Sequence, residues 1–201
     1  MAALSGQQLQ ELSRPLLQRL RGALDPPQVA PADTRGRRPA SVLLLFDPAS
    51  PRLPLLFMLR SSELRHHAGQ IAFPGGGHEA GDDDVVVTAL REAEEEVGLE
   101  PANVDVIGVL PPFVTAVSDR WLTPVVGLQR AAWTVRPDPV EVADWFLIEL
   151  TMLLHAPHEV RRLERDGVER DVHFYTLGER VIWGVTGAIL HELMRRLGRR
   201  D

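Results

Sequence analysis

The chain of 201 residues contains no cysteine. This absence excludes thiol nucleophiles, cysteine-bound zinc, iron–sulfur clusters and disulfides. Lysine is missing as well, because all 22 basic residues are arginine. Without lysine the chain can form no Schiff base through a side-chain amine and no P-loop of the Walker type.

Long apolar runs and a basic excess are also missing. No stretch of about 18 apolar residues occurs, and no basic segment followed by an apolar stretch opens the chain. We therefore expect no membrane span, no secretory signal and a cytoplasmic location. The net charge of −6 argues against a nucleic-acid-binding protein. The remaining composition, 44% hydrophobic and 25% charged, is typical of a globular chain with its own core.

Apolar periodicity outlines the organisation. Leucines spaced three and four residues apart predict a surface helix over residues 1–25, followed by a proline-containing loop. Short apolar runs bounded by turn residues predict strands at 40–46, 53–60, 104–110, 123–129, 144–148 and 171–177. Helical patterns follow at 85–97 and 181–197. We expect an extension over residues 1–35 and an α/β layered domain with a mixed sheet over residues 36–201.

The helix over residues 85–97 carries acidic residues on one face. Glu92, Glu95 and Glu96 stand at i, i+3 and i+4, so their carboxylates project together. Such a face is often only solvated, but a divalent cation would relieve the repulsion. The segment FPGGG (73–77) precedes the helix as a predicted glycine-rich loop, where a phosphate can approach and a carbonyl, such as that of Gly76, can join a metal shell.

These residues resemble the box of the Nudix hydrolases. That box reads Gly, five residues, Glu, seven residues, then Arg-Glu-apolar-x-Glu-Glu-x-Gly-apolar. The matching residues here are Gly77, Asp83, Arg91, Glu92, Ala93, Glu95, Glu96, Gly98 and Leu99. Aspartate replaces the first glutamate, and Gly76 with Asp82 fits equally well if one residue is added before Arg91.

The resemblance implies a Nudix-type α/β/α sandwich that binds Mg²⁺ or Mn²⁺. Glu95 and Glu96 would be metal ligands, and Glu92 a ligand or the catalytic base. Arg91 would clamp the carboxylates, whereas on the helix alone it is an i,i+4 partner of Glu95. Glu141 is a second candidate base or else a surface residue before a strand.

The segment RSSELRHHAGQIAFPGG (60–76) is similar to the signature of coenzyme A pyrophosphatases within this superfamily. It matches that signature at Arg60, Ser61, Arg65, Gly69, Phe73, Pro74, Gly75 and Gly76. This resemblance implies cleavage of coenzyme A, and of acyl-coenzyme A, to 3′,5′-ADP and 4′-phosphopantetheine. Arg60 and Arg65 would contact phosphates, beside the open backbone of Gly75, Gly76 and Gly77.

Other assignments stay open at this point. The substrate could instead be ADP-ribose, a dinucleotide or a nucleoside triphosphate, or the fold could be a binding module without catalysis. A monomer or a homodimer acting on a small molecule fits the sequence. His66 and His67 are loop residues or phosphate donors. His155 and His158 are a possible ligand pair, although Pro157 between them favours a surface loop.

Overall fold

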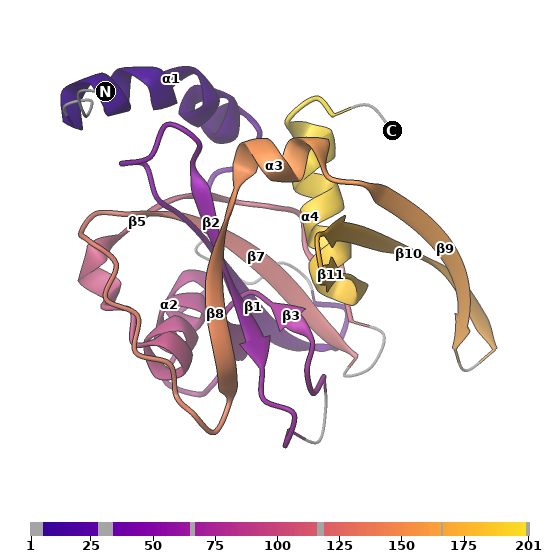
Figure 1. Cartoon of the computed structure of the whole chain (residues 1–201). Helices are drawn as coiled ribbons and strands as arrows, with labels where there is room; N and C mark the ends of the chain where they lie inside the picture. Colours follow the sequence, from indigo (N-terminus) through magenta and orange to yellow (C-terminus); the bar gives the residue numbers. More distant parts are fainter. Residues whose placement is uncertain (1–5, 28–33, 65–66, 116–118, 166, 200–201) are drawn as a thin grey trace.

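The computed structural model describes residues 6–27, 34–64, 67–115, 119–165 and 167–199. Figure 1 shows the arrangement of its elements. The helices are α1 (Gly6–Gly22), α2 (Val85–Val97), α3 (Leu150–His155), α4 (Gly184–Arg196) and the short 3-10 turn η1 (Pro101–Asn103). The strands are β1 (Arg38–Phe46), β2 (Pro54–Arg60), β3 (Ile71–Ala72), β4 (Gly75–Gly77), β5 (Val104–Val109), β6 (Phe113–Val114), β7 (Arg120–Gln129), β8 (Val142–Glu149), β9 (His158–Arg165), β10 (Val168–Leu177) and β11 (Arg180–Ile182).

The main sheet is mixed and is built around β1. This strand pairs in parallel with β7, in register from Arg38 opposite Arg120 to Phe46 opposite Leu128. On its other edge β1 pairs antiparallel with β4 near its start and with β2 at its end. The central order is β3-β2-β1-β7-β5, with β8 on β2 and β6 on β7. The mixed sheet predicted from the sequence is confirmed.

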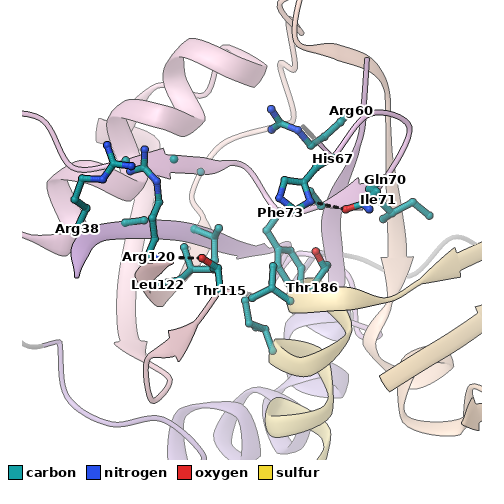
Figure 2. A pocket seen from close by; sticks show the side chains of 18 residues that line it. Arg38, Arg60, His67, Gln70, Ile71, Phe73, Thr115, Arg120, Leu122 and Thr186 are labelled. Atoms are coloured by element: carbon teal, nitrogen blue, oxygen red, sulfur yellow. Dashed lines mark hydrogen bonds between the residues drawn. The ribbon is translucent and has the colours of Figure 1, made fainter. Parts of the chain in front are cut away.

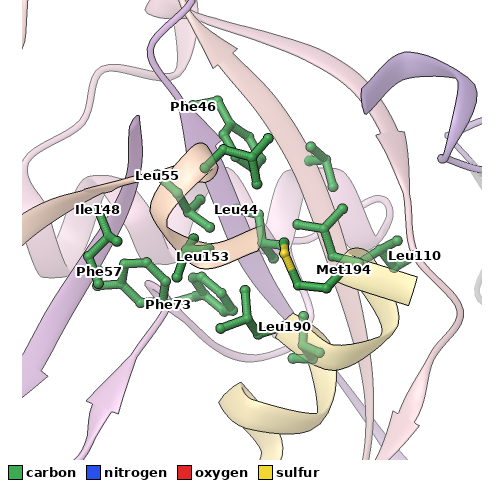
Figure 3. Close-up of a cluster of buried hydrophobic side chains, with 14 of the residues drawn as sticks. Leu44, Phe46, Leu55, Phe57, Phe73, Leu110, Ile148, Leu153, Leu190 and Met194 are labelled. Atoms are coloured by element: carbon green, nitrogen blue, oxygen red, sulfur yellow. The ribbon is translucent and has the colours of Figure 1, made fainter. Parts of the chain in front are cut away.

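Alternating residues of β1 divide the core into two layers. Leu43 and Leu45 pack with α2, whereas Leu44 and Phe46 belong to a second cluster with α4 and the end of α1. Figure 3 shows this second cluster, to which α4 contributes Leu190 and Met194. Each fully buried leucine contributes about 1.5–3 kcal/mol of transfer free energy, so both layers stabilise the fold. The sheet therefore lies between helices, as expected for an α/β/α sandwich.

The segment after β8 departs from the sequence-based expectations. The prediction of a strand at 171–177 is confirmed, but β10 is longer and pairs with β9 and β11 in a second, three-stranded sheet. The helix expected from residue 181 begins at Gly184, because residues 180–182 form β11. In the same way Gly75–Gly77, expected as a loop, is strand β4 against β1.

The helix predicted at the N-terminal end is present as α1 and ends at Gly22. Leu20 is fully buried, and Arg19 donates a hydrogen bond to the carbonyl of Leu197 beyond α4. The two ends of the described chain therefore pack together on one face of the sheet. Among the described residues, no helix has both the length and the apolar character needed to span a membrane.

Candidate active site

Local capping sets the limits of α2, the helix that carries the acidic residues. The Asp84 carboxylate accepts hydrogen bonds from the backbone N–H groups of Val86 and Val87 at 2.8 and 2.9 Å. Gly98 ends the helix with a φ of 67°, a conformation that favours glycine. The predicted helix over residues 85–97 is confirmed at both ends.

The glycine strand β4 lies directly against two of the three glutamates. Glu96 accepts hydrogen bonds from the N–H of Gly75 at 2.7 Å and from Nη1 of Arg60 at 3.1 Å. A Cβ on Gly76 would lie 2.5 Å from the carboxylate atoms of Glu92. The absence of a side chain at this position is therefore what allows Glu92 to approach the strand.

Arg91 links the strand to the helix through four partners. Its Nη2 donates to the carbonyl of Gly77 at 2.9 Å and to Glu92 at 3.1 Å. Its Nη1 donates to Glu95 at 3.0 Å, and Nε and Nη2 hold both oxygens of Asp82 at 3.0 Å. Arg91 is thus both the i,i+4 partner of Glu95 and a clamp on Glu92, whereas Glu96 is bound by Arg60 instead.

The two aspartates that the sequence offers in place of the first glutamate of the box differ in their surroundings. Asp82 is buried and bound to Arg91, whereas Asp83 is exposed. Hydrogen bonding from Arg91 holds the pKa of Asp82 far below its ordinary value, and the same bond raises the pKa of Arg91 above its own. Thr88 also donates its hydroxyl to Asp82 at 3.0 Å. Arg91 therefore contacts Asp82, the aspartate of the register with one additional residue.

Burial makes the negative charge of this face unfavourable without a cation. The side chain of Glu96 is 4% exposed, and desolvation raises its pKa to about 7. Burial likewise raises the pKa of Glu92, whereas Glu95 is 58% exposed beside Arg91. Clustered carboxylate oxygens are the ligands that Mg²⁺ and Mn²⁺ prefer, and a divalent ion would offset both burial and mutual repulsion. The residues fit such an ion.

Glu141 reaches the same face from the turn just before β8. Its carbonyl accepts a hydrogen bond from the N–H of Ser61 at 2.8 Å, which ties it to the end of β2. One carboxylate oxygen lies 3.9 Å from Nη2 of Arg60, the arginine that also binds Glu96. The sequence left Glu141 open between a site residue and a surface residue, and the structure brings it to the carboxylates.

A cavity of about 600 Å³ opens beside the glycine strand. Arg60 lines it together with Gly75, Gly76 and Gly77, and Figure 2 shows its other polar residues. Arg38 and Arg120 lie at one end and are Cα partners on β1 and β7. Within the described part of the chain neither arginine forms an ion pair, so the cavity is positively charged.

Sequence reasoning did not identify Arg38 and Arg120 as site residues. They come together only through the parallel pairing of β1 with β7, and no local spacing indicates that pairing. A Cβ on Gly77 would collide with the guanidinium of Arg120, so the glycine also makes room for this charge.

A second cavity of about 490 Å³ continues from the first. His67, Gln70 and Thr115 are among the residues that line both, and Phe113 and Trp183 add apolar surface to the second. Nδ1 of His67 donates to Gln70 Oε1 at 2.8 Å, which holds its ring in the shared wall. Arg65 and His66, considered above as phosphate contacts, lie outside the described residues.

Comparisons with known proteins agree with this geometry. The NUDIX domain family matches residues 36–171. A relative named "Uncharacterized Nudix hydrolase NudL" from Pectobacterium atrosepticum is 36% identical over 179 residues, which cover 87% of this chain and 90% of the relative. A protein of the same name from Escherichia coli O6:H1 is 39% identical over 167 residues, covering 83% and 86%.

A solved structure supports the fold across nearly the whole chain. The MutT/nudix family protein from Enterococcus faecalis aligns with a TM-score of 0.51 over 98% of this chain and 75% of its own, at 14% identity. The family match covers more than half of the chain, and the two relatives extend it across most of the remainder. Together with the arginine-clamped glutamates of α2, these matches show that the chain belongs to the Nudix hydrolases.

Proposed function

We propose that this Nudix hydrolase cleaves the pyrophosphate of coenzyme A and its thioesters, giving 3′,5′-ADP and 4′-phosphopantetheine. The observation that carries the proposal is the position of the described part of residues 60–76, the segment that resembles the signature of coenzyme A pyrophosphatases. Of the residues that match this signature, Arg60, Phe73, Gly75 and Gly76 line the cavity beside the carboxylates. The residues that resemble a substrate signature therefore lie where a substrate would bind.

The charges of the cavity suit a ligand with several phosphates. Coenzyme A carries a pyrophosphate and a 3′-phosphate, and arginine binds phosphate through paired N–H groups. Arg60 lies next to the carboxylates and would contact the pyrophosphate. Arg38 and Arg120, at the other end, would hold the 3′-phosphate. The adjoining cavity, with Phe113 and Trp183, would take the pantetheine arm.

Nudix hydrolases generally use divalent metal ions, and the acidic face suits Mg²⁺ or Mn²⁺. Glu92, Glu95 and Glu96 would supply carboxylate oxygens, and Gly76 a backbone carbonyl. When bound, the ion would neutralise the diphosphate oxygens and lower the pKa of the attacking water from about 15.7 toward neutrality.

The protein's own groups would orient the water and accept its proton. Arg91 fixes Glu92 and Glu95 by hydrogen bonds of 3.1 and 3.0 Å. We propose Glu92 as the base, because burial raises its pKa and so improves its capacity as a proton acceptor near neutral pH. Glu141, beside Arg60, is the alternative base.

A pH–rate profile at saturating metal separates the two bases. Glu92→Gln should abolish the acidic limb of kcat, and Glu141→Gln should leave that limb in place. Loss of the limb in Glu141→Gln, with only weakened metal binding in Glu92→Gln, would assign the base to Glu141.

The substrate is tested with purified protein, Mg²⁺ or Mn²⁺, and a panel of diphosphates whose products are identified by mass. The panel contains coenzyme A, its 3′-dephospho form, ADP-ribose and a nucleoside triphosphate. We expect coenzyme A to have the highest kcat/KM. A charge-assisted contact is worth about 1.5–3 kcal/mol, so Arg120→Gln should lower kcat/KM for coenzyme A by about 10–150-fold and change that for the dephospho form far less.

The matched control is Arg52→Gln. Arg52 is 65% exposed and pairs with Glu149 at 2.9 Å on the surface, away from the residues that line either cavity. Its replacement should leave kcat/KM unchanged. Preference of the wild-type enzyme for ADP-ribose over both forms of coenzyme A would contradict the proposed substrate, and an enzyme inactive on the whole panel would favour a binding module.

A further inference from the structure

Three histidines converge outside the acidic face. His158 begins β9, His173 lies in β10 and His191 lies in α4, and each offers a ring nitrogen within 4.8 Å of those of the others. Nε2 of His158 lies 3.0 Å from Nδ1 of His173. The ring centroids of His173 and His191 are 3.9 Å apart. All three side chains are partly exposed, so an ion from solvent can reach them.

The fold brings these residues together through pairing and close packing. His158 is the Cα partner of Tyr175, so His173 lies two residues away diagonally on the same face of the β9–β10 hairpin. On α4, a Cβ at Gly187 would collide with the carbonyl of His173, so glycine lets the helix approach the strand. His191 follows Gly187 by four residues and therefore projects from the same face of the helix.

We propose that His158, His173 and His191 bind one transition-metal ion of the Zn²⁺ class. Three imidazole nitrogens are a ligand set typical of zinc, and a water completes the tetrahedron. With Zn–N bonds of about 2.0–2.1 Å, tetrahedral ligands stand roughly 3.3–3.4 Å apart. Nε2 of His158 and Nδ1 of His173 are hydrogen-bonded to each other at 3.0 Å, which is already close to this separation.

The three rings reach the ion by turning, and bonds to the metal then replace the hydrogen bond between His158 and His173. All three pairs of imidazoles are stacked, with interplanar angles of 8°, 21° and 16°, so their in-plane lone pairs do not yet converge. Rotation about χ2 of histidine is broad and has little cost. The Tyr175 hydroxyl, 3.5 Å from Nδ1 of His191, is placed to orient this ring once Nε2 faces the ion.

This site differs in chemistry from the acidic face. Oxygen ligands suit Mg²⁺ and Mn²⁺, whereas imidazole suits zinc, copper and nickel. The sequence offered His155 with His158 as a possible pair, but the structure places His158 beside His173. His155 is exposed, and its Nδ1 donates a hydrogen bond to the carbonyl of Thr151 at 2.8 Å.

The test is a titration of the metal-free full chain with Zn²⁺ against a chromophoric chelator, in excess Mg²⁺. It is repeated in Glu96→Gln to remove binding at the acidic face. We expect one Zn²⁺ per chain in both proteins. His173→Gln and His191→Gln should each weaken binding by at least about 10–100-fold, the range that even an outer-shell partner costs. The matched control, His155→Gln, should bind as wild type does.

X-ray absorption spectroscopy of the wild-type zinc complex identifies the metal ligands without any substitution. Imidazole scattering from three histidines supports the site. An oxygen-only shell, or absence of zinc binding in the wild-type chain, overturns it, and the histidines are then a stacked structural contact. The proposed histidine site is also overturned if Glu96→Gln abolishes zinc binding and the histidine variants retain it.

Discussion

The buried carboxyl of Glu96 should make the stability of the metal-free protein fall as pH rises. Burial raises its pKa in the folded state from 4.5 to about 7, so between these values the folded protein binds more protons than the unfolded chain. The free energy of unfolding therefore decreases over this window. Each unit of pKa difference is worth about 1.4 kcal/mol, which gives a loss of about 2.5 kcal/mol between pH 5 and pH 8 from this group.

Comparison with Glu96→Gln isolates this contribution, because glutamine does not titrate. We expect the stability of the variant, relative to wild type, to increase by about 2.5 kcal/mol from pH 5 to pH 8 in EDTA. The measurement is urea unfolding followed by tryptophan fluorescence at several pH values. Mg²⁺ should stabilise wild type most at high pH, where Glu96 is ionised, and the variant much less. A stability difference that stays constant with pH would refute the reasoning.

The same site yields further predictions from its glycines and its arginine. Gly76→Ala should fold, because the three atoms nearest to its Cβ are those of the Glu92 carboxylate, the end of a side chain, but it should lower kcat by at least about tenfold through displacement of that group. Gly75→Ala meets backbone, with the Cα of the opposing strand at 2.6 Å, so thermal unfolding should show a loss of about 2–3 kcal/mol or more. Arg91→Ala leaves the buried Asp82 without its cation and should cost about 3–5 kcal/mol in urea unfolding. Adding Asp82→Asn should recover part of that loss, and full additivity would contradict the pairing.

The elements that could be predicted from the sequence are those determined by residues close together in the chain. The ends of α2 are set by a capping aspartate, Asp84, and by Gly98 in the left-handed region. Both residues can be recognised in the sequence, because they flank the helical apolar pattern. The face shared by Glu92 and Glu96 follows from helical spacing alone. The division of the chain at residues 35 and 36 and the roles of the site residues stay predictions.

Features that depend on long-range pairing were not predictable in this way. The triple glycine of β4 has the composition of a loop, yet it pairs with β1, where a Cβ on Gly75 would collide with the backbone of that strand. Arg38 meets Arg120 only through a parallel register between distant strands. His173 and His191 come from a strand and a helix whose contact depends on Gly187. In each of these contacts the two residues are far apart in the sequence, and no local sequence pattern indicates that they meet.

The helices at the two ends of the described chain pack over one face of the sheet, and this packing limits how far the chain can be truncated. The family match stops at residue 171, yet Leu190 and Met194 of α4 and Leu20 of α1 cover the apolar side chains of that face. Arg196 adds hydrogen bonds to Asp25 at 3.1 and 3.2 Å. A fragment trimmed to residues 36–171 would lack the helices that cover one face of the sheet. The apolar side chains of that face would then be exposed to solvent and prone to self-association. The residues of the candidate active site lie close together in the sequence, but α1 and α4 cover one face of the sheet that holds them.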